Sequence, residues 1–197
     1  MFHLIPLIKA IGYAGIFGII FCESGVFFAF FFPGDTLLFS VGVLAYQHYF
    51  NLWIAVVYVC VAAIAGGLFG FWTGKKIGPR IFTREDSLFF KKSYVKKAQM
   101  FFTKYGNVTV FISRYIPIVR TFAPTVAGVA QMKNKNFFIY NFLGGTTWCA
   151  SLVLFGYFLG EKIPDIDKYL LPIVAFVCVA SFLPLIFEVF KRKNKTE

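Results

Sequence analysis

The sequence predicts an all-α integral membrane protein, a helical bundle with two opposed re-entrant helical hairpins in an inverted-repeat arrangement. Three observations lead to this fold class. Of the 197 residues, 58% are hydrophobic, 21% aromatic and only 15% charged, whereas an average soluble domain has about 25% charged residues. Several apolar stretches reach the length of about 20 residues that a membrane span needs. Two further apolar stretches carry helix breakers and charged residues near their middle.

The long apolar stretches that contain at most one charged residue are expected to cross the bilayer. They are residues 52–74, 137–160 and 170–190, and a fourth candidate is residues 4–22. No small-residue cleavage pattern follows the fourth, so we interpret it as a retained helix rather than a signal peptide. We expect one membrane domain over residues 1–197, with a first half (1–74) and a second half (105–190).

The two broken stretches are residues 26–47 and residues 108–132. Halves of roughly 8 to 14 residues on either side of a breaker are too short to span, so each stretch is expected to be a re-entrant hairpin, at about residues 24–47 and 108–132. The breaks are assigned to Pro33, Gly34, Pro117 and Pro124. The alternative for each stretch is a kinked helix that spans the membrane fully.

Basic residues predict the orientation. Nine of the 20 Lys and Arg lie in residues 75–104, and four more lie in the tail, residues 191–197. The positive-inside rule places both segments in the cytoplasm, the first as an amphipathic segment on the membrane surface. Following the chain from there puts both termini in the cytoplasm. The net charge of +11 is also typical of nucleic-acid binding, but the hydropathy favours contact with anionic lipid, and we expect no nucleic-acid partner.

Four ionisable residues lie in or beside apolar stretches: Glu23, Asp35, Arg114 and Arg120. A charge at bilayer depth costs at least about 2.5 kcal/mol, so each is a candidate functional residue. The two arginines flank Pro117 and present planar forks of donors that suit a phosphate group. Burial favours the neutral form of either carboxyl, which would allow proton exchange near neutral pH unless an arginine opposes it. The sequence therefore predicts a phosphate site at the arginines and a proton site at the acids.

Less specific roles remain open for these residues. Both arginines could form structural salt bridges with the acids, and Asp35 could cap a helix that starts at Thr36. Asn141 and Trp148 interrupt an apolar stretch and are interpreted as helix-packing residues.

Enzymatic and metal chemistry is not expected. Phosphate-ester chemistry normally needs a nucleophile with a histidine, or several metal-binding carboxylates. Here Ser113 has no evident base, and the two histidines, His3 and His48, lie outside the second hairpin. The isolated cysteines are interpreted as small apolar residues: Cys22, Cys60, Cys149 and Cys178. We therefore expect no cofactor, no metal and no catalytic residue.

The sequence resembles the DedA family, the bacterial branch of the SNARE-associated or VTT-domain superfamily. The resemblance is carried by Glu23 with Phe32-Pro33-Gly34-Asp35, and by FISRYIPIVRTFAPTVAGVAQM followed by FFIYNFLGGTTWCASLVLFGYFLG. It covers nearly the whole chain. It implies paired re-entrant hairpins, the bacterial cell membrane, and movement of undecaprenyl phosphate or phosphatidylethanolamine that depends on the proton motive force. The family's essential acids match Glu23 and Asp35, and its essential arginines match Arg114 and Arg120.

The leading hypothesis is a proton-coupled lipid transporter or flippase, with undecaprenyl phosphate as the best candidate among anionic lipids. A phospholipid flippase or scramblase acting on phosphatidylethanolamine is one alternative. A proton-coupled exporter of small cations or drugs is another, in which the acids would bind the substrate. The sequence is compatible with a homo-oligomer.

Overall fold

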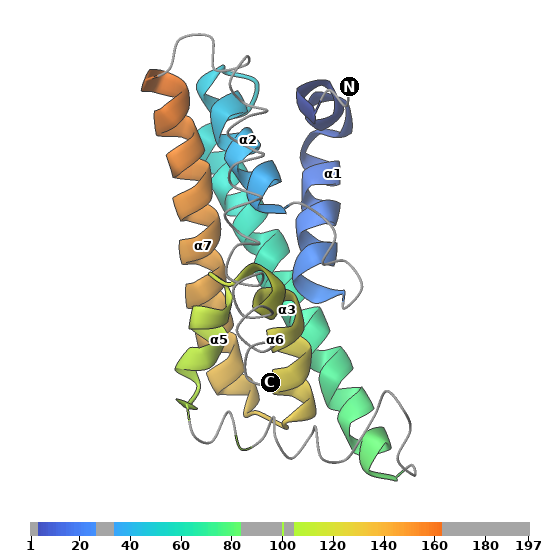
Figure 1. Ribbon diagram of the computed structural model, residues 1–197. Helices are drawn as coiled ribbons and strands as arrows, with labels where there is room; N and C mark the ends of the chain where they lie inside the picture. Colours follow the sequence, from blue (N-terminus) through green and yellow to red (C-terminus); the bar gives the residue numbers. More distant parts are fainter. Residues whose placement is uncertain (1–3, 27–33, 84–99, 101–104, 163–197) are drawn as a thin grey trace, which may run out of the picture.

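A computed structural model of the chain describes residues 4–26, 34–83, 100 and 105–162 (Figure 1). The predicted break at Pro33, most of the basic segment 75–104, the span at 170–190 and the tail 191–197 lie outside the described residues. The described elements are α-helices: α1 (Leu4–Gly25), α2 (Gly34–Tyr46), α3 (Leu52–Thr83), α5 (Val108–Ser113), α6 (Pro117–Val129) and α7 (Asn134–Lys162). The predicted all-α class is confirmed.

Two long antiparallel helices form the frame of the bundle. The apolar parts of α3 and α7 comprise 26 residues (Leu52–Ile77) and 29 residues (Asn134–Lys162). At 1.5 Å per residue they measure about 39 and 44 Å, which exceeds the roughly 30 Å of a bilayer core. Large apolar side chains are exposed along both, such as Trp53 and Trp72 on α3 and Phe155 on α7. Such faces are typical of helices that contact lipid.

Two short helices start at mid-height and run to opposite ends. Figure 1 shows α2 rising from the middle to the upper end and α6 descending from the middle to the lower end. Each has 13 residues and is therefore about 20 Å long, too short to cross a bilayer core. α2 begins at Gly34 and α6 has Pro117 in its first turn, so these two predicted breaks lie at helix starts.

The break assigned to Pro124 is wrong. Pro124 lies inside α6 and does not end it. Proline lacks an N–H group, but its effect is local here, because α6 continues to Val129 and its other residues are positioned by α3.

The same turn ends both short helices. After α2, the N–H of Tyr49 donates to the Leu44 carbonyl at 3.0 Å, and after α6 the N–H of Met132 donates to the Ala127 carbonyl at 3.1 Å. His48 (φ 61°) and Gln131 (φ 58°) supply the left-handed residue of each turn. This is the Schellman arrangement, and it reverses the chain into the following long helix.

Helix α1 does not follow the predicted path. Residues 4–22 were expected to span from the face where Lys75 lies, antiparallel to α3. Instead, Gly12 (φ 56°, ψ −159°) kinks α1, and the part after the kink runs parallel to α3. Tyr13 contacts Phe50, and Phe21 contacts Phe69, at ring-centroid distances of 4.9 and 5.7 Å. The segment that descends alongside α3 is therefore residues 13–25.

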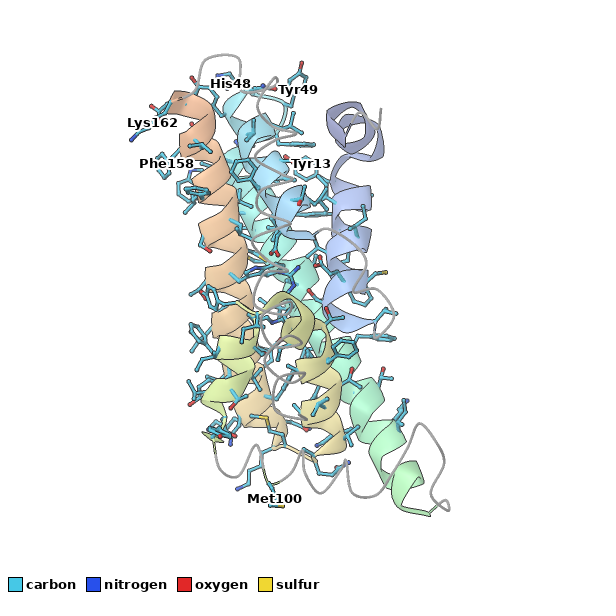
Figure 2. All side chains as sticks on the ribbon, viewed as in Figure 1. Tyr13, His48, Tyr49, Met100, Phe158 and Lys162 are labelled. Atoms are coloured by element: carbon cyan, nitrogen blue, oxygen red, sulfur yellow. The ribbon has the colours of Figure 1, made fainter. Side chains whose placement is uncertain are left out.

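The hydropathy pattern does not reveal the kink, because glycine is apolar by composition but free to adopt positive φ. The N-terminal end of α1 lies at the upper end of the molecule, together with His48 and Tyr49 and opposite Met100 (Figures 1 and 2).

Glycines let each short helix pack closely on the long helix of the other half. Gly42 of α2 lies against the backbone of Val153 in α7, and Gly128 of α6 lies against the backbone of Phe71 in α3. A side chain at either glycine would collide with main-chain atoms. The two halves are thus interlocked, with α2 parallel to α7 and α6 parallel to α3. Two buried apolar clusters fill the interior, one around Leu38 and Val41 and one around Phe71 and Phe137.

Candidate functional site

The buried polar site forms at mid-height, where the N-terminal ends of α2 and α6 meet. Asp35 lies in the first turn of α2, and Arg120 in the first turn of α6. Glu23 reaches the same place from the lower part of α1. Because α2 starts at Gly34, Asp35 does not cap a helix at Thr36, and its carboxylate turns toward the second half.

Arg120 binds both acids. Its Nη2 donates to Oε1 of Glu23, and its Nη1 donates to Oδ1 of Asp35. The side chains of Arg120 and Glu23 are only 6% and 3% exposed, and that of Asp35 is 16% exposed. In such a water-poor environment the attraction between opposite charges is much stronger than in water. One guanidinium therefore joins the two halves of the molecule.

Trp148 of α7 completes this cluster. Its indole Nε1 donates to Oδ1 of Asp35 at 3.1 Å. The Arg120 guanidinium carbon lies 4.5 Å from the centroid of the same ring, a cation–π contact. The sequence pattern predicts only a helix-packing role for Trp148 and does not indicate this contact with the ion pair. The available signal was the single tryptophan within the motif that resembles the DedA family.

Arg114 has different partners. It follows the last residue of α5, is 1% exposed, and its Nη2 donates to the carbonyl of Ala63 at 3.3 Å and to Oδ1 of Asn141. The Asn141 amide in turn donates to the carbonyl of Ile64 at 3.1 Å. Arg114 forms no ion pair with a carboxylate among the described residues. The predicted structural salt bridges are thus found for Arg120 and not for Arg114.

Two glycines make room for these side chains. A methyl group at Gly34 would overlap the Glu23 carboxylate, and one at Gly67 would overlap Nη2 of Arg114 and Oδ1 of Asn141. A side chain at either position would therefore require the polar groups of the site to shift.

Three buried polar atoms of the site lack a hydrogen-bond partner among the described residues: Oε2 of Glu23, Nη1 of Arg114 and Nε of Arg120. A buried polar atom without a partner costs about 1–3 kcal/mol, more when it is charged. The site therefore has spare capacity for a proton on Glu23 and for acceptor atoms next to the two arginines.

Comparison with known proteins identifies the family of this chain. The VTT domain family matches residues 32–158, which include Asp35, Arg114, Arg120 and Trp148. The chain is 37% identical to the Protein DedA of Escherichia coli K12 over 98% of its own length and 90% of that protein. The chain belongs to the DedA family.

Other DedA family relatives are also membrane proteins by name. An uncharacterised membrane protein of Mycobacterium tuberculosis is 40% identical over 86% of this chain and 75% of its own length. The inner membrane protein YqjA of E. coli is 33% identical over 84% and 79% of the two chains. No solved structure matches this chain. The protein is accordingly a helical integral membrane protein of the DedA family.

Proposed function

We propose that this DedA family protein moves a phosphate-bearing lipid, in the first instance undecaprenyl phosphate, across the bacterial cytoplasmic membrane in a proton-coupled process. The single observation that carries the proposal is the shared guanidinium of Arg120, which the buried carboxylate of Glu23 and the partly buried carboxylate of Asp35 hold at mid-height. Nearby, Arg114 is buried without a carboxylate partner among the described residues. Arg120 is thus paired with carboxylates of the protein itself, whereas Arg114 retains an N–H donor without a partner among the described residues.

The proposed architecture is a pair of opposed re-entrant hairpins. The first comprises residues 13–46 with α2 as its returning arm, and the second comprises α5 and α6. Support comes from the 13-residue length of α2 and α6, their matching terminal turns and their opposite directions. Positive ends of both helix dipoles then point at the centre, where they favour an anion.

In the proposed cycle, a lipid phosphate competes with the carboxylates for Arg120. A proton that binds Glu23 or Asp35 removes one of the negative charges that hold the guanidinium. The phosphate then takes its place, with Arg114 as the second ligand and the lipid tails remaining in the bilayer. Because linkage is reciprocal, phosphate binding and proton binding strengthen each other, so the lipid binds more tightly as pH falls.

The same geometry disfavours the export of small cations. A cation at the acids would have to displace Arg120, which is covalently part of the protein and contacts both carboxylates.

The identity of the lipid is a separate question. Because phosphatidylethanolamine also carries a phosphate, only a direct assay distinguishes it from undecaprenyl phosphate as the substrate. The orientation, with residue 75 toward the cytoplasm, is proposed from the positive-inside rule.

The test is a translocation assay in proteoliposomes, with polyprenyl phosphate or labelled phosphatidylethanolamine in the inner leaflet. We expect Arg114→Gln to slow translocation at least tenfold, and Glu23→Gln to abolish its dependence on external pH. Lys76→Gln changes an exposed cation of α3 and should leave the rate unaltered. Normal rates for folded Arg114→Gln would contradict the phosphate site, and faster movement of phosphatidylethanolamine than of polyprenyl phosphate would change the assigned lipid.

A further inference from the structure

A surface groove lies between α3 and α7, away from the buried charges. It has a volume of about 390 Å³ and is lined by Leu68, Phe69, Phe71, Trp72, Asn134 and Phe138. Trp72, Phe69 and Phe138 are 62%, 51% and 49% exposed. Apart from Asn134, the lining residues are apolar. The groove therefore suits a hydrocarbon chain rather than a polar ligand.

The wall of the groove is rigid. Phe71 and Phe137 are 1% and 0% exposed, and their rings stack with centroids 4.1 Å apart and an interplanar angle of 6°. A preformed apolar wall lowers the entropy that a bound chain and its site lose on association.

A lysine stands at one end of the groove. Nζ of Lys75 lies 2.5 Å from Oδ1 of Asn134, itself a lining residue, and 5.3 Å from the centroid of the Phe71 ring. Lys75 follows Leu68 by seven residues, so the Cα atoms of these two residues are separated by about 10 Å along α3. The groove thus leads from a cation into an apolar channel.

Further cations surround this end, and no carboxylate of the described residues balances them. Lys76, Lys133 and Lys135 are exposed next to Lys75 and Asn134. Of the described acids, Glu23 and Asp35 are in the buried site, and Glu161 is near the far end of α7. An occupant must therefore combine an anionic group with an apolar chain.

We propose that this groove binds one anionic phospholipid of the surrounding leaflet, its phosphodiester at Lys75, Lys133 and Lys135 and one acyl chain along Trp72, Phe69 and Phe138. The bilayer supplies both chemical groups at the required depth. The site is separate from the buried arginines, and the inference does not depend on the proposed transport.

Native mass spectrometry of the full-length protein in detergent tests this inference, with phosphatidylglycerol and phosphatidylcholine of identical acyl chains as probes. We expect the wild type to retain one phosphatidylglycerol with at least tenfold preference over phosphatidylcholine. The triple substitution Lys75→Gln, Lys133→Gln and Lys135→Gln should remove that preference. The control Lys162→Gln removes an exposed cation from the opposite end and should not (Figure 2).

A second pair of variants tests the apolar part. Trp72→Ala should weaken retention of both lipids several-fold, whereas Trp53→Ala, at a 69% exposed position of the same helix outside the groove, should have no effect. Because both tryptophans are largely exposed, both variants should fold. Equal retention of the two lipids by the wild type, equal effects of the two tryptophan substitutions, or a dimer mass that replaces the lipid-bound monomer would overturn the inference.

Discussion

Arg114 and Arg120 lie at neighbouring ends of α5 and α6 and are both buried, but their surroundings differ. Arg120 binds two carboxylates and stacks on Trp148, so two negative charges lie next to its single positive charge. Arg114 binds the neutral oxygens of Ala63 and Asn141. Arg120 therefore acts as an ionic link between the two halves, whereas Arg114 is a buried cation with neutral partners, and under the proposed function it is the one that receives an external anion. Four predictions test this difference, beginning with the largest expected effect.

Replacing Arg120 should destabilise the protein most. Arg120→Met leaves two buried carboxylates without their cation, and breaking a buried ion pair costs about 3–5 kcal/mol. Thermal or denaturant unfolding in detergent measures the loss. Adding Glu23→Gln and Asp35→Asn to Arg120→Met should recover much of it, since no uncompensated charge remains. Failure of the triple variant to recover would mean that Arg120 stabilises the fold by packing and not by charge.

The matched substitution at the other arginine should cost less. Arg114→Met leaves only neutral acceptors unpaired, on Ala63 and Asn141, and a buried unpaired polar group costs about 1–3 kcal/mol. The same unfolding measurement applies, with Arg120→Met as the reference. If Arg114→Met lowered the stability more than Arg120→Met, Arg114 would have a carboxylate partner in addition to Ala63 and Asn141.

The close packing of Arg114 and Asn141 against Gly67 gives a third test. Gly67→Ala places a methyl group against both Arg114 and Asn141 and should cost about 1–3 kcal/mol, the usual range for overpacking. Gly18→Ala in α1 meets no atom within 4 Å and should be neutral or slightly stabilising, as alanine favours helix. Equal stability of the two alanine variants would show that the Arg114–Asn141 contact is not tight.

The smallest effect is expected at the indole. Trp148→Phe keeps an aromatic ring near Arg120 but removes the donor to Asp35, a loss of about 0.5–1.5 kcal/mol. In a double-mutant cycle with Asp35→Asn, the two substitutions should be non-additive. Additive effects would show that the hydrogen bond contributes nothing to stability.

Much of the fold could be predicted from composition and breakers. Long apolar runs identified α3 and α7, and the breaks at Gly34 and Pro117 fell at helix starts. The path of α1 could not be predicted, because nothing in the hydropathy pattern of residues 4–22 distinguishes Gly12, where the kink lies, from a glycine inside a straight helix. Only its ring contacts with α3 reveal that the two helices are parallel.

The sequence by itself determined that Glu23, Asp35, Arg114 and Arg120 belong to a membrane protein, because charges in apolar stretches are too costly to be incidental. It could not determine how they pair. Charge neutrality allows either arginine to meet either acid, and only the interlocking of α2 with α7 and of α6 with α3 brings both acids to Arg120. The same packing sets Asn141 and Trp148 beside the arginines. Which residues pair depends on the distances between them across the bundle. For residues far apart in sequence, those distances are set only when the chain folds.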